Sequence, residues 1–360
     1  CIFIFLTPKM NMSKFKYLSA YILAYTVYLS FTSYGIWTYS PLLFSFVFIP
    51  LLELAFKPSA KNFTKEEQQK LKNDPFFDFV LYTVVLVQVG FLIFFLFTIQ
   101  EPVSNFELIG RILSFGVLCG IFGINVGHEL GHRKNRFQQF LGEILLLTSL
   151  ETHFLPYHNS GHHYNVATPK DPATAKKGEL VFLFWFRSQI GSYIQAWKIE
   201  TKLLRNKNNH FFSFKNRMLN YTIAQLLLLG TINYAFNFNT MIAFIGASLV
   251  GILMLETVNY IEHYGLLRKI NENGKYERVL PQHSWNSNHL VGRTILFELS
   301  RHSDHHFKAS KHYQLLDSLS NSPQMITGYP GMMLLALIPP LWFKITHKQL
   351  DQFQKKSSQL

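Results

Sequence analysis

Three short runs of the chain bring histidines together at the spacing that metal ligands use. They lie at residues 128–132 (HELGH), 158–163 (HNSGHH) and 302–306 (HSDHH), and the run NYIEHYG at 259–265 adds one more. Neutral imidazole is the commonest side-chain metal ligand and suits iron, zinc and copper. The candidate ligands, which we also take as the catalytic residues, are His128, His132, His158, His162, His163, His263, His302, His305 and His306. Nine imidazoles are too many for one ion of coordination number about four to six, so the sequence predicts a two-metal enzyme.

Residues 128–132 taken alone match H-E-x-x-H, the zinc-protease signature. In that interpretation Glu129 would be the general base that activates a metal-bound water. A zinc protease needs one further ligand and not seven, so the other runs favour two metals. A membrane zinc protease and a histidine-rich metal carrier without catalysis remain alternatives.

Three acidic residues lie beside predicted ligands: Glu129, Glu262 and Asp304. A metal-bound histidine usually donates its second N–H to a carboxylate or carbonyl, and these three are expected to accept such bonds. Salt bridges with nearby arginines are the alternative for each. Of the remaining histidines, His153, His283 and His289 are expected to be structural or to support the ligands, and His210, His312 and His347 to lie on the surface.

The composition indicates a membrane protein. Of 360 residues, 48% are hydrophobic and only 15% are charged, against about 25% charged in soluble domains. The net charge of +13 is explained by lysines and arginines on the cytoplasmic side of a membrane, so no nucleic-acid partner is predicted. Cys1 and Cys119 form no C-x-x-C pair, which excludes an encoded iron–sulfur centre.

Six apolar stretches approach the length of about 20 residues that crosses a bilayer. They fall at 17–31, 36–56, 77–97, 108–127, 219–236 and 241–260. Alternate connections carry almost no lysine or arginine, and the other side collects nearly all of them. The positive-inside rule therefore places both termini, and all nine histidines, in the cytoplasm. The predicted fold is all-α, with six transmembrane helices under a histidine-rich cytoplasmic cap.

The chain is expected to form one membrane domain over residues 17–343. It would follow a cytoplasmic segment, residues 1–16, of which residues 1–9 are expected to be upstream sequence because Met10 or Met12 is a natural start. Residues 344–360 read as a polar, loosely ordered tail. Residues 317–329 read as a loop, and the short apolar stretches 141–150, 180–186 and 331–343 as helices that cap the spans or lie at the interface.

The histidine runs and their neighbours resemble one known family. The resemblance rests on GHELGHRK (127–134), HNSGHHYNVATPKDPATAKKGE (158–179), NYIEHYGLLR (259–268), HSWNSNHLV (283–291), RHSDHH (301–306) and GYPG (328–331). These are similar to the integral-membrane alkane 1-monooxygenases, non-haem di-iron ω-hydroxylases related to membrane fatty-acid desaturases. The His-Tyr-Gly element distinguishes them from desaturases. The chain departs from the family at Tyr157, where a glutamate is usual, and at Ser300, where a glutamine is usual.

The resemblance implies two iron ions held by the nine histidines, and O2-dependent terminal hydroxylation of medium- or long-chain n-alkanes to 1-alkanols. Acid–base residues alone cannot cleave an unactivated C–H bond, so a redox metal is required and zinc is disfavoured. The resemblance further implies that rubredoxin, itself reduced by rubredoxin reductase, supplies the electrons, and that the enzyme lies in a bacterial inner membrane. A basic cytoplasmic face would suit such an acidic donor. Hydroxylation of an alkylbenzene methyl group and fatty-acyl desaturation remain alternatives. Aromatic residues of the second span, Trp37, Phe44, Phe46 and Phe48, would either set the depth of a substrate channel or face lipid.

Overall fold

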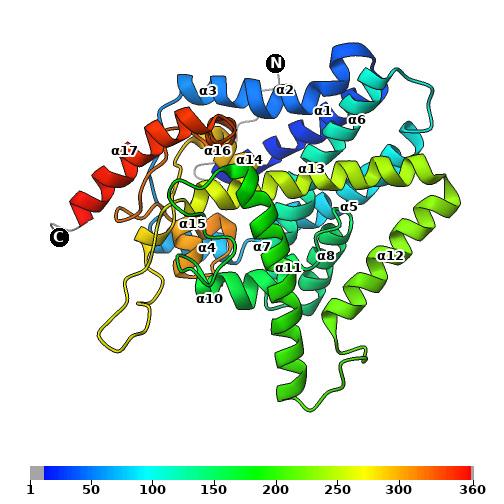
Figure 1. The fold of residues 1–360 in the computed structure, drawn as a ribbon. Helices are drawn as coiled ribbons and strands as arrows, with labels where there is room; N and C mark the ends of the chain where they lie inside the picture. The colour runs from blue at the N-terminus through cyan, green and yellow to red at the C-terminus, as the bar shows by residue number, and fades with distance from the viewer. Residues whose placement is uncertain (1–11, 358–360) are drawn as a thin grey trace.

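The computed structural model describes residues 12–357, which form helices joined by turns (Figure 1). Within that range no strand forms, and only two isolated bridges pair extended residues. The all-α prediction is confirmed. Residues 1–9 lie outside the described part of the chain.

Four helical segments are long and apolar enough to cross a membrane. Gly35–Ala55 comprises η2 (Gly35–Tyr39), α2 (Ser40–Leu43), η3 (Phe44–Phe48) and α3 (Ile49–Ala55), and Asn105–Gly131 comprises α6 (Asn105–Leu118), η4 (Cys119–Asn125) and α7 (Val126–Gly131). The other two are α5 (Phe76–Thr98) and α13 (Phe238–His263). The remaining predicted spans correspond to α1 (Tyr21–Thr32), which follows 3₁₀ turns at Met12–Ala20, and to α12 (Arg217–Ala235). The first is short in its α-helical part and the second carries several polar residues, so the count of six stays a prediction.

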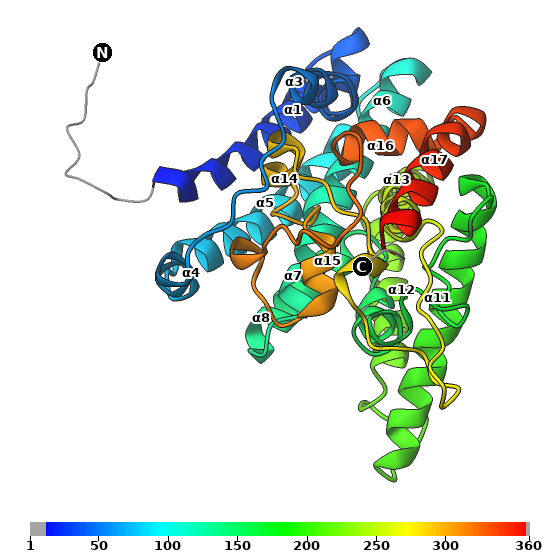
Figure 2. The ribbon, with the colours of Figure 1, turned by 90° about the vertical axis from the view of Figure 1, so that its left-hand side faces the viewer.

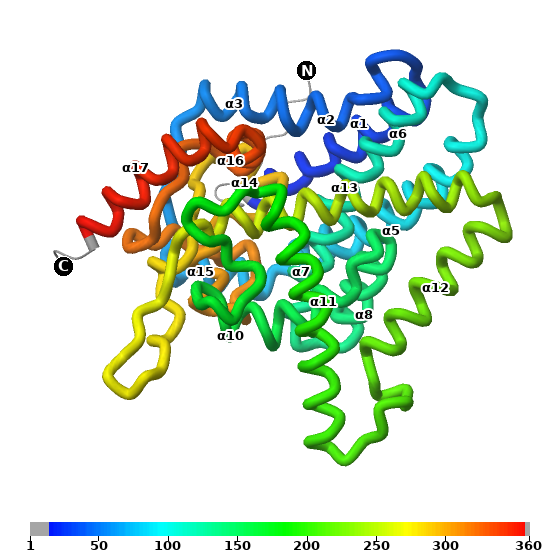
Figure 3. The backbone as a smooth tube through the Cα atoms, viewed as in Figure 1, coloured from blue at the N-terminus to red at the C-terminus, as the bar shows by residue number. Residues whose placement is uncertain are grey.

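Three turns between these helices meet at one end of the bundle, on the right in Figures 1 and 3. The backbone N–H of Gly35 donates to Glu107 (2.9 Å), and the amide of Asn237 donates to Gln100 (2.8 Å). The histidine-bearing segments lie toward the opposite end. The bundle thus has a turn end and a histidine end.

The remaining helices, most of them short, cover the histidine end. They are α4 (Lys65–Lys72), α8 (Arg136–Leu147), α9 (Phe154–Tyr157), η5 (His158–His162), α10 (His163–Asn165), α11 (Val181–Asn206), η6 (Pro281–His283), α14 (Leu290–Ile295), α15 (His302–Phe307), η7 (Tyr313–Leu315), α16 (Tyr329–Ala336) and α17 (Pro339–Ser357). The short apolar stretches predicted to be helical fall in α8, α11, α16 and α17. The predicted loop is confirmed up to Gly328, where α16 is about to begin.

The loosely ordered tail predicted for residues 344–360 is wrong as far as the structure describes it. Residues 339–357 form α17, and Trp342 and Leu350 on this helix are fully buried. Trp342 packs against Tyr260 and Tyr264 at ring-centroid distances of 5.3 and 5.2 Å. Buried apolar residues spaced along this mostly polar helix hold it on the cap. The average polarity of the segment does not reveal them.

Helices α7 and α8 cross closely, and this crossing positions the first histidine run. A Cβ added at Gly142 would lie 2.9 Å from the carbonyl oxygen of Gly127, so a side chain at Gly142 would push the helices apart. The contact holds α7 against the cap at the residue before His128.

Candidate metal centre

The structure gathers all nine predicted ligands into two neighbouring groups. In each group the ligand atoms lie within 4.8 Å of one another. The first histidine group is His128, His132, His158, His163 and His305, and the second histidine group is His162, His263, His302 and His306. The groups draw on α7, η5, α10, α13 and α15, so segments far apart in the sequence build one site.

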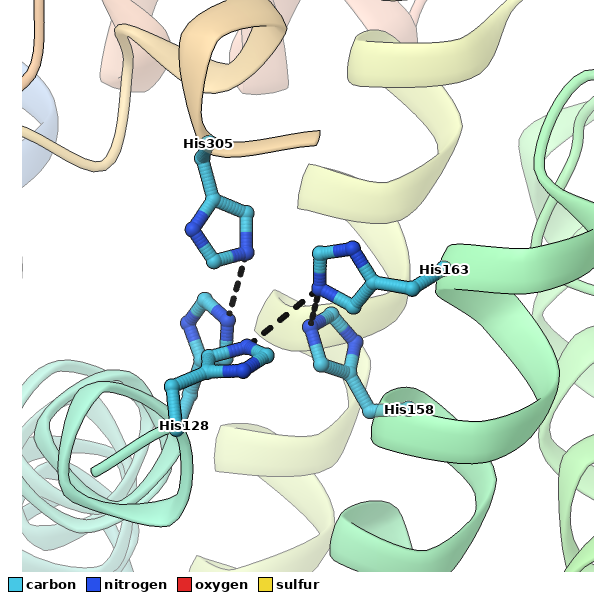
Figure 4. A group of neighbouring side chains, drawn as sticks. His128, His158, His163 and His305 are labelled. Atoms are coloured by element: carbon cyan, nitrogen blue, oxygen red, sulfur yellow. Dashed lines mark hydrogen bonds between the residues drawn. The ribbon is translucent and has the colours of Figure 1, made fainter. Parts of the chain in front are cut away.

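Ring nitrogens in the first histidine group point toward one another (Figure 4). The Nε2 atoms of His128 and His305 are 3.0 Å apart, and Nε2 of His163 lies 3.0 Å from that of His158 and 3.3 Å from that of His132. Two nitrogens about 2.1 Å from a shared ion at an angle of about 90–110° are separated by about 3.0–3.4 Å. The spacing is therefore that of ligands around one ion.

The second histidine group repeats this spacing. Nε2 of His302 is 3.1 Å from Nε2 of His263, and Nε2 of His162 is 3.2 Å from Nε2 of His306. A carboxylate oxygen of Glu262 also lies 3.1 Å from Nε2 of His302. This group therefore has an oxygen donor beside its nitrogens.

A π-helical turn explains how one short run serves both groups. The backbone N–H of His163 donates to the carbonyl of His158, five residues earlier, in η5. In this wider turn, residues four and five positions after His158 fall on either side of it. His163 thus joins His158 in the first histidine group, while His162 is directed to the second.

Burial keeps six of the site histidines in the neutral form that binds metals. Burial, followed by the charge of neighbouring imidazoles, lowers the pKa of His132, His158, His163, His302, His305 and His306 well below the usual value. A largely buried donor set made mostly of imidazoles at this spacing fits a transition-metal ion. Five nitrogens in the first group exceed the four ligands of a typical zinc site.

Asp171 supports the second histidine group, a role that its place in the sequence does not predict. Its carboxylate lies 3.0 Å from Nδ1 of His162 and accepts hydrogen bonds from Tyr157 (2.5 Å) and Thr174 (2.7 Å). Burial raises the pKa of Asp171, but His162 and these hydrogen bonds together bring it below its usual value. Tyr157, at the position of the expected glutamate, thus fixes a carboxylate that comes from thirteen residues beyond the first histidine of this run.

The three predicted acidic neighbours have different partners. Glu262 faces His302 and accepts a hydrogen bond from Tyr329 (2.6 Å). Glu129 instead pairs with Arg133 (3.0 Å) and accepts from the backbone of Tyr313, so the base required by a zinc protease is engaged elsewhere.

Asp304 is also occupied away from the histidines. Its carboxylate pairs with Lys311 (2.6 Å) and accepts the backbone N–H of Asp317 (2.7 Å). Among the three predicted acids, therefore, the geometry supports a role beside a ligand only for Glu262.

None of the other six histidines joins either group within residues 12–357. His153 lies between Glu151 (3.4 Å) and Ser192 (3.3 Å), and His283 lies 3.2 Å from Glu277. Two of the histidines expected on the surface are half-buried: His312 contacts Arg133, and His347 lies 2.8 Å from the hydroxyl of Tyr264.

An apolar cavity reaches both histidine groups from the interior of the bundle. His128 and His158 of the first group and His302 of the second lie in its wall. The other lining residues include Ser45, Phe46, Gly120, Ile121, Ile124, Phe154, Met254, Leu255, Val258, Leu296, Leu299 and Met333. Of the four aromatic residues expected either to set a channel depth or to face lipid, Phe46 lines this cavity, whereas Trp37 and Phe48 are more than half exposed.

Comparison with known proteins decides the family. The model of the fatty acid desaturase family matches residues 106–334, which contain all nine ligands. The chain is 38% identical to an alkane 1-monooxygenase of Ectopseudomonas oleovorans over 87% of this chain and 78% of the relative. The chain belongs to the alkane 1-monooxygenase family.

Other relatives are similar at lower or more local identity. An alkane 1-monooxygenase 2 of Pseudomonas aeruginosa is 41% identical over 65% of this chain and 62% of its own length. The hydroxylase component of a xylene/toluene monooxygenase of Pseudomonas putida is 28% identical over 77% of this chain and 75% of its own. This enzyme is thus a membrane monooxygenase in a family whose members are named for apolar substrates.

Proposed function

We propose that this enzyme hydroxylates the terminal carbon of medium- or long-chain n-alkanes with O2. The observation that carries the proposal is the apolar cavity that ends on both histidine groups. An alkane offers no polar group to grip, so it must be bound by shape, with each buried CH₂ contributing about 0.8 kcal/mol. The relatives named alkane 1-monooxygenase support this substrate class.

The nine histidines would hold two iron ions, which supply the O2 and electron-transfer chemistry that no side chain provides. The residues of this chain do the rest. Asp171 holds the Nδ1 proton of His162 and so orients its Nε2 toward the second group. The cavity walls exclude water and align the chain end with the histidines.

We further propose rubredoxin, kept reduced by rubredoxin reductase, as the electron donor. The chain encodes no iron–sulfur site of its own, and its net charge of +13 favours an acidic partner. In this proposal residues 17–343, together with the rest of α17 to Ser357, form one membrane hydroxylase domain in a bacterial inner membrane, with both termini and the histidine end in the cytoplasm. Lys14 and Lys16 before α1, and the lysines of α4, follow the positive-inside rule in that orientation.

The test is product analysis with matched metal analysis. Purified enzyme in lipid nanodiscs is given octane or hexadecane, ¹⁸O2 and reduced rubredoxin, and products are separated by gas chromatography. We expect ¹⁸O-labelled 1-alkanols and about two irons per chain. The His302→Ala variant should lose activity and bind less iron, whereas a zinc protease built on residues 128–132 would survive it. Alkenes, or no oxidised product, would contradict the proposal.

A second substrate class has one observation in its favour, the similarity to the xylene/toluene monooxygenase component. Octane and toluene compared at equal concentration separate the two. A higher kcat/KM for toluene would make the methyl group of an alkylbenzene the substrate.

A further inference from the structure

The two histidine groups differ in their access to water. His132 and His163 of the first histidine group are half-buried, whereas all four members of the second are buried. Each of the two half-buried residues lies in the wall of a separate surface hollow that is lined mostly by polar and charged residues. An electron carrier that docks at the surface therefore comes closest to the first group.

The hollow at His132 is lined by four exposed lysines, Lys65, Lys72, Lys134 and Lys308, which we name the four-lysine basin. It lies between α4, the turn after α7, the start of α8 and the turn after α15, which gather on one side in Figure 2. The side chains that line it include no carboxylate.

The charges of the basin are available to a partner. Arg133 and Lys311, which also line it, are paired with acidic residues of the chain. None of the four exposed lysines has an ion-pair partner between residues 12 and 357. Their positive field is thus not neutralised by neighbouring side chains and would attract an anionic surface.

Helix α4 is arranged so that its cationic face lines the basin. Its lining residues, Lys65, Gln68, Gln69 and Lys72, have the i, i+3, i+4, i+7 spacing of one helix face. The acidic residues Glu66 and Glu67 are not in the wall, and Glu67 is held by the capping box with Thr64. The net charge of α4 is close to zero, but the face that lines the same hollow as His132 is positively charged.

The second hollow, at His163, has a weaker case. It is lined by Lys170, Arg268, Lys275 and Arg278, but Glu277 lies in the same wall, and Arg268 donates to the backbone carbonyls of Tyr164 and Glu277. It serves as a matched control, because it has similar charges and borders another ligand of the same histidine group.

We propose that the four-lysine basin docks an acidic, one-electron redox protein, which delivers electrons to the first histidine group beside His132. The inference rests on the proposed function, which needs two electrons per turnover: the alkane, O2, two electrons and two protons give the alcohol and water. The reductant is the reduced acidic carrier, oxidised by one electron in each of two encounters.

The experiment uses the full-length enzyme in nanodiscs of zwitterionic lipid and purified rubredoxin as the probe. The double variant Lys134→Glu/Lys308→Glu is compared with the control Lys170→Glu/Lys275→Glu. Calorimetry measures the binding of oxidised rubredoxin, and stopped-flow absorbance measures the oxidation of reduced rubredoxin at several salt concentrations. In the basin variant we expect binding to weaken about tenfold or more, with a shallower dependence on salt. The control should bind like the wild type, and both variants should keep their iron content.

The outcomes separate the docking site from the function. If dithionite-reduced wild type gives 1-octanol and the basin variant oxidises rubredoxin like the wild type, the docking proposal fails and the function stands. If the control double weakens binding as much as the basin double, docking at this basin is also refuted. If the basin double loses only binding to vesicles that contain anionic lipid, the basin binds lipid and the proposal is overturned. A wild type that forms no alcohol with either reductant refutes the proposed function itself.

Discussion

Within the metal centre, the carboxylate of Asp171 links the ligand His162 to the protein around it. It accepts a hydrogen bond from Nδ1 of His162 and is itself held by Tyr157 and Thr174, and all four residues are buried. A charged acceptor fixes the imidazole tautomer and raises the basicity of the nitrogen that faces the metal. The second histidine group therefore depends on a residue that is not a ligand.

Asp171→Asn should weaken metal binding at the second histidine group by about 10–100-fold, because the charged acceptor for His162 is lost. The readout is iron per chain after dialysis against a weak chelator, which should fall from about two toward one. Asp304→Asn is the matched control, since that carboxylate pairs with Lys311. Equal iron loss in the two variants would contradict the assignment.

Acidification should destabilise the metal-free protein steeply below about pH 6.5. Burial lowers the pKa of His153 to about 4 and the pKa of His158, His302 and His305 well below the usual value. Above pH 6.5 these groups are neutral in both states and contribute nothing. Below it the unfolded chain binds protons that the native state excludes, so each such histidine removes about 1.4 kcal/mol of stability per pH unit.

The measurement is the thermal midpoint of the metal-free enzyme between pH 7.5 and 5.5. His153→Gln should reduce the dependence of the thermal midpoint on pH, because one histidine that excludes a proton in the native state is gone. The midpoint of the iron-loaded enzyme should stay constant until the metal is released. A midpoint that stays constant over this range would show that the buried histidines already carry protons in the native state.

The sequence predicted the ligands well and their supports poorly, for a physical reason. Ligands must share a helix face, so their spacing is visible in a run such as 302–306. Asp171 reaches His162 across a turn, and Glu129 accepts the backbone N–H of Tyr313, which comes from a distant segment of the chain. Such choices depend on tertiary contacts, which adjacency in the sequence does not report.

At the scale of elements, π-helical turns in the apolar helices open or direct the site. η3 carries Ser45 and Phe46 into the cavity wall, and η4 carries Gly120 and Ile121. The apolar composition of the sequence predicted these spans but not the π-helical turns within them. Such a turn holds one extra residue and leaves the apolar character of the span unchanged. The docking of α17 was not predicted either, because its two buried residues, Trp342 and Leu350, lie in a segment that is polar on average.

Ser45→Phe should narrow the cavity and favour shorter alkanes. Ser45 is small and nearly fully buried in the wall, and each CH₂ excluded from the pocket forfeits about 0.8 kcal/mol of binding. We expect the ratio of hexadecane to octane turnover to fall by about tenfold or more, measured by gas chromatography of mixed substrates. Val47→Phe, on the same turn but half exposed, is the control and should keep the wild-type ratio. An unchanged ratio in Ser45→Phe would place the chain outside this cavity.

At the scale of the molecule, the four clear spans constrain the two marginal helices. Gly35 at the end of the α1 turn contacts Glu107, and Asn237 after α12 contacts Gln100. The turns that follow α1 and α12 therefore lie at the same end as the connection between α5 and α6. Helix α12 is about 28 Å long at 1.5 Å per residue, close to the bilayer core of about 30 Å.

We therefore expect all three turns to face the side of the membrane opposite the histidines, as six spans require. In a background where Cys1 and Cys119 are serine, Tyr34→Cys, Asn105→Cys and Asn237→Cys should react with a membrane-impermeant maleimide once the outer membrane is opened. Lys72→Cys and Lys207→Cys, at the histidine end, should react only after the inner membrane is permeabilised. Reaction of Lys14→Cys before the inner membrane is permeabilised would show that α1 does not cross, and reaction of Lys207→Cys at that stage would show the same for α12. Labelling of the Lys72→Cys variant in intact inner membranes would show that the whole molecule has the opposite orientation. The lysine-rich connections would then lie outside, against the positive-inside rule.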